Sequence, residues 1–166
     1  MGRCGASWCR LPSDAMQTTQ NSAALFSGEF RHALDGKNRV TIPSRWRLTE
    51  ADEFHLVPDS QQNCLRVMPP DEFRAVSDQA AQLPGMTPKE HRVFMRQFYS
   101  RSQHVVADKQ GRILVPDEYC RRFKLEGEIV LVGVRETFEL WNAEAWQKTQ
   151  TNEEPTYDRW ADQLGI

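Results

Sequence analysis

Short apolar segments separated by turn residues dominate the hydrophobic pattern of this 166-residue chain. Helical periodicity replaces this pattern over residues 71–83 and again after Thr87-Pro88-Lys89-Glu90, which has the form of a capping box. Strands and helices in this mixture predict an α+β fold. The predicted strands cover residues 26–34, 39–42, 54–57, 64–68, 104–107, 112–115, 129–134 and 137–141.

Two short helices are predicted where a proline follows a strand, over residues 43–48 and 116–123, because proline suits the first turn of a helix. The nearly continuous apolar run at residues 129–134 predicts a fully buried strand that pairs with residues 137–141 across a turn. Asn142 is expected to cap a last helix. The remainder, from Gln147, is polar and acidic, and we expect it to fray; docking of Trp160 and Leu164 is the alternative.

One motif occurs twice in the chain. Residues 35–43 (DGKNRVTIP) recur 73 positions later as residues 108–116 (DKQGRILVP). Asp, Arg and Pro occupy the same offsets in both copies, and similar residue types continue downstream to residues 65–68 and 138–141. A unit of this size is too small to bury a good core alone, so the two copies are predicted to pack on each other.

Asn38 and Gly111 occupy the fourth position of the two motifs, and both residue types tolerate a positive φ. Each copy is therefore predicted to make a tight turn with a left-handed residue just before its arginine. The aspartate four residues before that arginine is placed to pair with it. Two interpretations remain open: the pair only staples the turn, or the aspartate orients an arginine that presents its planar donors to a phosphate or a base edge.

The net charge of −2 excludes a uniformly basic protein, but the charges are unevenly distributed. Residues 28–48 hold five basic and two acidic side chains, and residues 101–124 hold six and three. Residues 144–166 hold two basic and five acidic side chains. Positive charge therefore gathers around the two motifs, which is typical of a modest nucleic-acid contact, although a solvated surface of mixed charge fits as well.

Other chemistry finds little support in the sequence. The cysteines at positions 4, 9, 64 and 120 lack metal-ligand spacing, and the four histidines are scattered. No nucleophile with a positioned base and no carboxylate pair stands out, so we expect no metal, no cofactor and no catalytic residue. No apolar run approaches the roughly 20 residues that a membrane helix needs. Without a visible signal peptide, a cytoplasmic location with reduced thiols is expected.

The two motifs and their flanking segments resemble those of the MraZ family of bacterial transcriptional regulators, which carry two tandem SpoVT/AbrB-like motifs. The resemblance rests on residues 26–30 (FSGEF), the two D-x-x-x-R turns, residues 111–116 (GRILVP) and residues 130–141, and it extends over about residues 26–147. It implies a swapped-hairpin β-barrel formed by the two repeats, with short helices and a helical connector.

The resemblance also implies a division of the chain and a function. The expected segments are a disordered extension (1–25), repeat 1 (28–75), a helical connector (76–102), repeat 2 (103–146) and an acidic C-terminal tail (147–166). The implied function is sequence-specific DNA binding: a nucleoid-associated regulator of the division and cell-wall gene cluster. It would bind repeated promoter elements upstream of its own operon as a ring-shaped homo-oligomer. The alternative is an oligomeric scaffold protein without nucleic-acid binding.

Candidate DNA-binding residues follow from two sources. The family pattern points to the D-x-x-x-R turns and their neighbours, which here are Asp35, Lys37, Arg39, Asp108, Lys109 and Arg112. The charge distribution adds Arg31, Arg45 and Arg47. The first copy departs from the family in having Asn38 where Gly is usual. We expect the first copy to dominate DNA contact, because the helix after the second motif starts with acidic residues.

Overall fold

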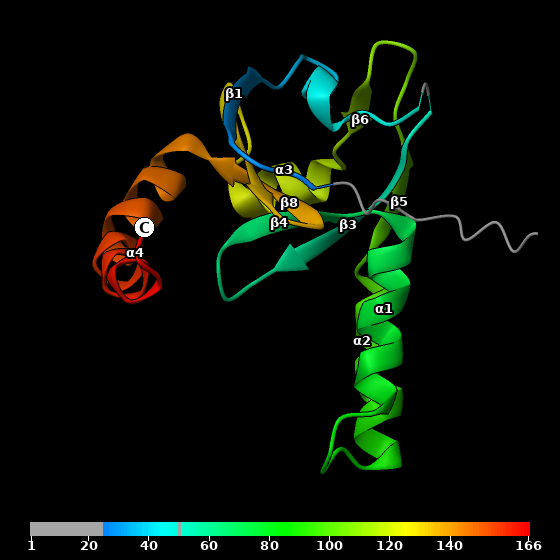
Figure 1. Ribbon diagram of the computed structural model, residues 1–166. Coiled ribbons are helices and arrows are strands. Elements are labelled where there is room, and N and C mark those ends of the chain that lie inside the picture. The colour runs from blue at the N-terminus through cyan, green and yellow to red at the C-terminus, as the bar shows by residue number, and fades with distance from the viewer. Residues whose placement is uncertain (1–24, 50) are drawn as a thin grey trace, which may run out of the picture.

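The computed structural model describes residues 25–49 and 51–166, and it has an α+β fold (Figure 1). The extension predicted for residues 1–25 therefore lies outside the described residues, apart from Leu25. Along the chain the elements are β1 (Glu29–Ala33), β2 (Arg39–Thr41), the 3₁₀ turn η1 (Ser44–Trp46), β3 (Glu53–Asp59), β4 (Cys64–Met68), α1 (Pro70–Ala81), α2 (Pro88–Ser100), β5 (Gln103–Val106), β6 (Arg112–Leu114), α3 (Asp117–Phe123), β7 (Glu128–Val134), β8 (Thr137–Asn142) and α4 (Ala143–Leu164).

Six strands form one antiparallel sheet in the order β1-β7-β8-β4-β3-β5, and β2 pairs with β6 as a separate antiparallel ribbon. Strands β1 to β4 correspond to β5 to β8 in the two repeats. Each repeat therefore gives its first strand to the other: β1 pairs with β7, and β5 pairs with β3. This exchange explains why two small units fold together, as the repeat predicted.

The strand register places a pseudo-twofold axis through the molecule. At the centre of the sheet Arg66 lies opposite Glu139, and in the ribbon Val40 lies opposite Ile113. Both pairs join residues that are 73 positions apart, which are equivalent positions of the two repeats. The axis therefore passes between the two members of each pair and exchanges them. The two D-x-x-x-R turns flank this axis.

A single large core joins the sheet, the ribbon and α3. Its centre is a cluster of four aromatic rings, in which Phe138 lies 5.1 Å from Phe26, 5.1 Å from Trp46 and 5.5 Å from Phe54, centroid to centroid. Gly133 lets the chain at Phe26 pass directly over β7, since a Cβ at this position would lie 2.6 Å from backbone atoms. The aromatic residue that precedes β1 is thereby held in the core.

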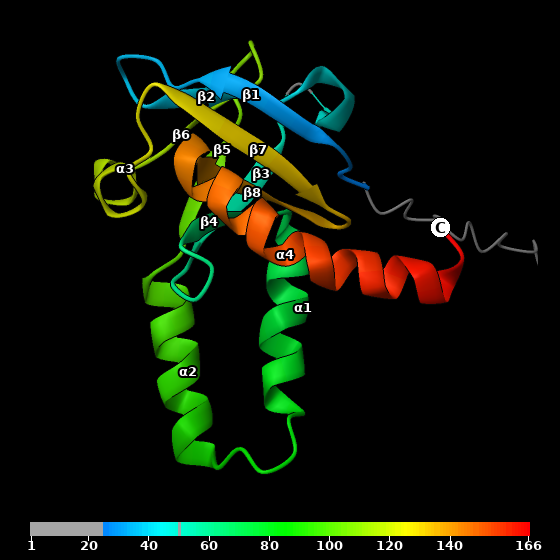
Figure 2. The same ribbon diagram turned by 90° about the vertical axis from the view of Figure 1, so that its left-hand side faces the viewer.

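Helices α1 and α2 form a hairpin that projects from the sheet (Figure 2). The Thr87–Glu90 capping box is confirmed: Glu90 Oε2 accepts the Thr87 N–H at 2.8 Å, and Thr87 Oγ1 accepts the Glu90 N–H at 3.3 Å. Phe73 of α1 stacks on Phe98 of α2 at 4.7 Å and on His55 of β3 at 4.0 Å. Stacked rings therefore tie the hairpin to the sheet.

Three sequence-based expectations differ from the structure. The last helix does not fray but continues to Leu164, because Asn142 caps its start by accepting two N–H groups and Gly165 ends it in the left-handed conformation. The first short helix is only one 3₁₀ turn. The strand expected to be fully buried ends exposed at Val134. No described helix has the length and apolar character to cross a membrane.

Candidate functional site

The first D-x-x-x-R turn is closed by its aspartate. Asp35 Oδ1 accepts the backbone N–H groups of Lys37 and Arg39, both at 2.9 Å. Its other oxygen accepts Arg39 Nε at 2.8 Å and pairs with Arg39 Nη2 at 2.7 Å. Asn38 has a φ of 56°, so the predicted left-handed position is confirmed. One edge of the Arg39 guanidinium is thus fixed by Asp35, which leaves the Nη1 donors to face a ligand.

The second turn repeats this geometry. Asp108 Oδ1 accepts the backbone N–H groups of Gln110 at 2.9 Å and Arg112 at 3.0 Å. Asp108 Oδ2 accepts Arg112 Nε at 2.9 Å and pairs with Nη2 at 2.7 Å. Gly111 has a φ of 73°. The staple predicted for the Asp–Arg pairs therefore exists in both copies, and the arginine side chains still keep 31% (Arg39) and 26% (Arg112) of their surface exposed.

The ribbon brings the two turns side by side, although they are 73 residues apart in the chain. Arg112 Nη1 lies 3.8 Å from Asp35 Oδ2, so the second arginine also approaches the first aspartate. The Ile42 N–H donates to the Gly111 carbonyl and the Val115 N–H donates to the Asn38 carbonyl, each at 2.8 Å. The result is one surface with two oriented guanidinium groups, which suits recognition of phosphates or base edges.

Both aspartates are held in the ionised form. The Arg39 side chain, followed by the Arg39 backbone N–H, lowers the pKa of Asp35 from 3.8 to about 2. Arg112 lowers the pKa of Asp108 to about 2 in the same way. A carboxylate with a depressed folded-state pKa stabilises the protein above the unfolded-state pKa and loses that contribution as pH falls towards the folded-state pKa.

We expect the turns to contribute to acid sensitivity between pH about 4 and about 2. The free energy of unfolding of the native protein should fall through this window more steeply than that of the double variant Asp35→Asn/Asp108→Asn, because the variant has no carboxyl to protonate at these turns. Urea unfolding at a series of pH values measures the difference. Parallel curves for the two proteins would contradict the pKa assignment.

The two turns are not equivalent in their surroundings. The Asn38 side chain donates to Asp117 at the start of α3. The acidic helix start, which was the reason to expect less DNA contact from the second turn, therefore lies beside the first turn. At the second turn Arg47 donates from Nη1 to the Gln110 carbonyl at 3.2 Å and lies against Gly111, where a Cβ would overlap its side chain. The motif position that differs between the copies therefore determines which neighbour packs on each turn.

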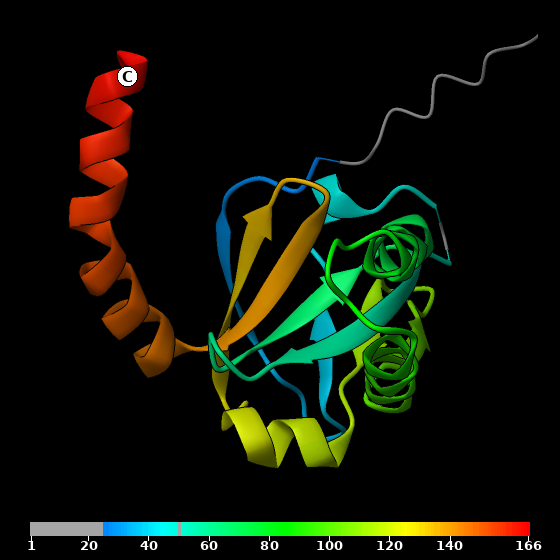
Figure 3. The same cartoon turned by 90° about the horizontal axis from the view of Figure 1, so that it is seen from below.

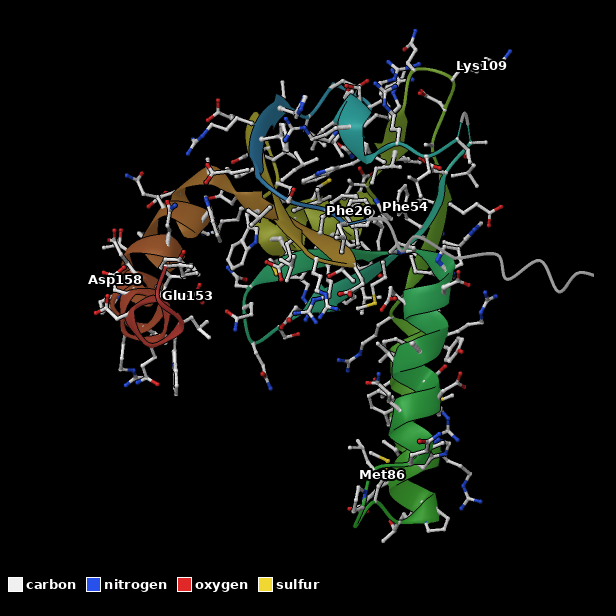
Figure 4. The ribbon with its side chains drawn as sticks, viewed as in Figure 1. Phe26, Phe54, Met86, Lys109, Glu153 and Asp158 are labelled. Atoms are coloured by element: carbon white, nitrogen blue, oxygen red, sulfur yellow. The ribbon has the colours of Figure 1, made fainter. Side chains whose placement is uncertain are left out.

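The remaining predicted residues differ in whether other side chains already contact them. Lys37 and Lys109 are exposed, and Lys109 projects from the end of its turn into solvent (Figure 4). Arg45 lies over the Phe30 ring at 5.3 Å from the ring centroid, while remaining exposed. Arg31 pairs with two carboxylates, Glu128 at 3.1 Å and Glu29 at 3.3 Å. Arg31 is the weakest candidate, because acidic neighbours already balance its charge.

Two basic residues beside the first turn were missing from the sequence-based set. A hollow of about 320 Å³ next to Asn38 is lined by Arg121 and Lys124 from the α3 region, among others. The positive balance of residues 101–124 already included both side chains, but the sequence could not place them beside the first turn. Within the described ranges no group of His, Cys, Asp and Glu side chains forms a metal site.

Comparison with known proteins reproduces the internal repeat. The model of one protein family, described as "MraZ protein, putative antitoxin-like", matches the chain twice, over residues 25–96 and 98–164. The second match begins 73 residues after the first, which is the offset of the repeated motif. The two halves of the chain are thus two copies of one family unit.

Several curated proteins named transcriptional regulator MraZ are similar over most of their length. The protein from Lactiplantibacillus plantarum is 36% identical over 140 residues, which cover 84% of this chain and 98% of that protein. The protein from Pediococcus pentosaceus is 37% identical over 140 residues, covering 84% and 96%. The one from Clostridium tetani is 36% identical over 124 residues, covering 75% and 86%. With the double match of the family model, these similarities show that this chain belongs to the MraZ family.

Proposed function

We propose that this protein is a sequence-specific DNA-binding transcriptional regulator. The observation that carries the proposal is the pair of adjacent turns, in which each arginine is oriented by the aspartate of its own turn and stays partly exposed. An Arg fork held in this way matches the O6 and N7 acceptors of guanine in the major groove. The names of the curated relatives support the same function and give no support to an enzyme.

The residues of this surface take different roles in the proposal. Arg39 contacts base edges or phosphates with the guanidinium edge that faces away from Asp35, and Arg112 contacts them with the exposed part of its side chain. The exposed lysines of the two turns contact phosphates, which positions the protein without reading sequence. The basic residues around the turns extend this phosphate contact, and we propose that they are Arg45, Arg47, Arg121 and Lys124, with Arg31 contributing least.

We further propose that the sheet and the β2–β6 ribbon form the swapped-hairpin β-barrel implied by the family. The exchange of first strands between repeats and the core shared by sheet and ribbon both support this description. The proposed units are repeat 1 (28–75), a helical connector (76–102), repeat 2 (103–146) and the C-terminal segment (147–166). The barrel would hold the two turns rigidly beside each other.

A single protomer offers few contacts to DNA, so we propose that several act together. A ring-shaped homo-oligomer would engage repeated elements in the promoter of its own operon, the division and cell-wall gene cluster. In this proposal the protein is cytoplasmic and associated with the nucleoid. Linking weak sites in this way increases affinity by roughly 10²–10⁴-fold when the geometry allows simultaneous contact. The alternative function, a scaffold without nucleic-acid binding, leaves the oriented arginines without a ligand.

Footprinting of the purified protein on the DNA upstream of its own gene tests the proposal. We expect protection of short repeats at a regular spacing, with a stoichiometry of several protomers per DNA measured on the same complex. A shuffled DNA of equal length and composition is the control. No binding at low salt would favour the scaffold function, whereas equal affinity for both DNAs would contradict the proposed sequence specificity.

A further inference from the structure

The second half of α4 leaves the body of the protein and exposes an apolar stripe. α4 and the α1–α2 hairpin lie on different sides of the molecule (Figures 1 and 3), so they do not cover each other. Tyr157, Trp160 and Leu164 lie on one face of the helix. All three are exposed, Trp160 to 53% and Leu164 to 76%. Pro155 inside the helix removes one backbone donor, and residues of this type bend helices.

Among the described residues, few contacts stabilise this part of the helix. The contacts of α4 with the body are made mainly to β7 and β8, near its start. Isolated helices of about 12–15 residues are marginal in water, and amphipathic helices gain most of their stability from packing of the apolar face. Exposed aromatic and aliphatic side chains in a stripe of this kind are typical of a protein interface.

The charges around this stripe define the partner that fits it. Carboxylates and one basic residue, Arg159, whose guanidinium lies over the Trp160 ring at 5.3 Å from the ring centroid, flank the apolar side chains. Among the described residues none of these carboxylates lies within ion-pair distance of a basic group. We call this set the tail surface: Glu154, Tyr157, Asp158, Trp160, Asp162 and Leu164.

A complementary surface exists on the α1–α2 hairpin. The outer face of α2 carries three basic residues around an exposed valine, and in the described part of the chain these three form no ion pair. Leu83 at the tip of the hairpin is also exposed. We call this set the hairpin surface: Leu83, Lys89, Arg92, Val93 and Arg96. Six other arginines in the described residues are paired with carboxylates: Arg31, Arg39, Arg66, Arg74, Arg112 and Arg135.

We propose that the tail surface of one copy docks on the hairpin surface of the next copy. Opposite charges around an apolar centre favour this pairing and disfavour contact between two tail surfaces. Because the two surfaces differ, the contact is heterologous, and repetition of one heterologous contact closes a ring when the rotation permits. The inference rests on the oligomer of the proposed function and assigns the interface that builds it.

Charge reversal in the whole protein, measured without DNA by analytical ultracentrifugation, tests the docking. We expect Arg92→Glu/Arg96→Glu and Glu154→Lys/Asp158→Lys each to raise the concentration needed for assembly by at least about 10-fold. In a 1:1 mixture of the two variants the reversed contact alternates with the native one, so the mixture should assemble, but only into closed rings with an even number of copies. The protein that carries all four changes makes only reversed contacts, and it should recover the wild-type mass.

Two controls accompany this measurement. Arg135→Glu changes an exposed charge outside both surfaces, and Leu48→Ala removes an exposed apolar side chain elsewhere, so both should assemble normally. Trp160→Ala/Leu164→Ala should weaken assembly without loss of the β-sheet signal in circular dichroism.

The outcomes separate the interface from the function. An oligomer whose mass is unchanged in both reversed variants overturns the docking and leaves the proposed ring standing. A wild-type protein that stays monomeric at high concentration overturns both. If Arg92→Glu/Arg96→Glu assembles normally but loses promoter affinity, the hairpin surface contacts DNA and the docking is wrong.

Discussion

Arg39→Ala is expected to reduce the affinity for promoter DNA by at least about 100-fold. One bidentate contact between arginine and guanine is worth about 1–3 kcal/mol, and the loss is multiplied when two or more protomers bind one DNA together. Asp35 holds the Arg39 guanidinium through two bonds, so the native side chain binds without a large loss of rotamer freedom. Gel-shift titration at fixed salt measures the change.

Matched variants separate base contact from general charge. Arg135→Ala removes an exposed arginine from the connection between β7 and β8 and should leave the affinity nearly unchanged. Lys37→Ala should weaken binding to all DNAs and reduce the slope of log affinity against log salt by about one. Arg39→Ala should lose more affinity for DNA than Arg112→Ala, and this comparison tests the expected dominance of the first turn. Unaltered affinity of Arg39→Ala with an intact oligomer would contradict the site.

Phe138→Ala is expected to lower the free energy of unfolding by about 3–5 kcal/mol, the usual cost of emptying a buried phenylalanine site. Phe138 is fully buried, and its ring, from the second repeat, meets three aromatic rings from the first half of the chain. Small domains have a total stability of about 5–15 kcal/mol, so this variant should be partly unfolded near physiological temperature. Urea unfolding at 25 °C gives the difference.

Two comparisons establish whether the cost arises from the shared core. Phe138→Leu keeps most of the volume and should lose less than half as much. Phe94→Ala removes a half-buried ring of the projecting hairpin and should also be milder. A loss below about 1 kcal/mol for Phe138→Ala would mean that the aromatic cluster does not hold the repeats together.

The local features of the site were predictable because each depends on a few adjacent residues. The left-handed Asn38 and Gly111, the two Asp–Arg staples and the Thr87–Glu90 cap all follow from spacing along the chain. The approach of Arg112 to Asp35 was not predictable, because it depends on pairing of β2 with β6 across the repeats.

The length of α4 was missed for a different reason. Its second half is polar, acidic and interrupted by a proline, which together indicate a frayed tail. The cap at Asn142 and the left-handed Gly165 define a helix with an apolar stripe that the average composition conceals. The periodicity of Tyr157, Trp160 and Leu164 was the signal that could have identified it.

The exchange of first strands sets the timing of folding during synthesis. β1 leaves the ribosome long before β7, which is its one neighbour among the described strands of the sheet. The side chains of Arg31 and Glu128 that meet there are 97 residues apart. At roughly 5–20 residues per second, the nascent first repeat waits on the order of 5–20 s with its apolar strand faces uncovered. A ribosome that stalls within the second repeat would therefore release a chain that exposes strand edges and aggregates rather than a half-active regulator.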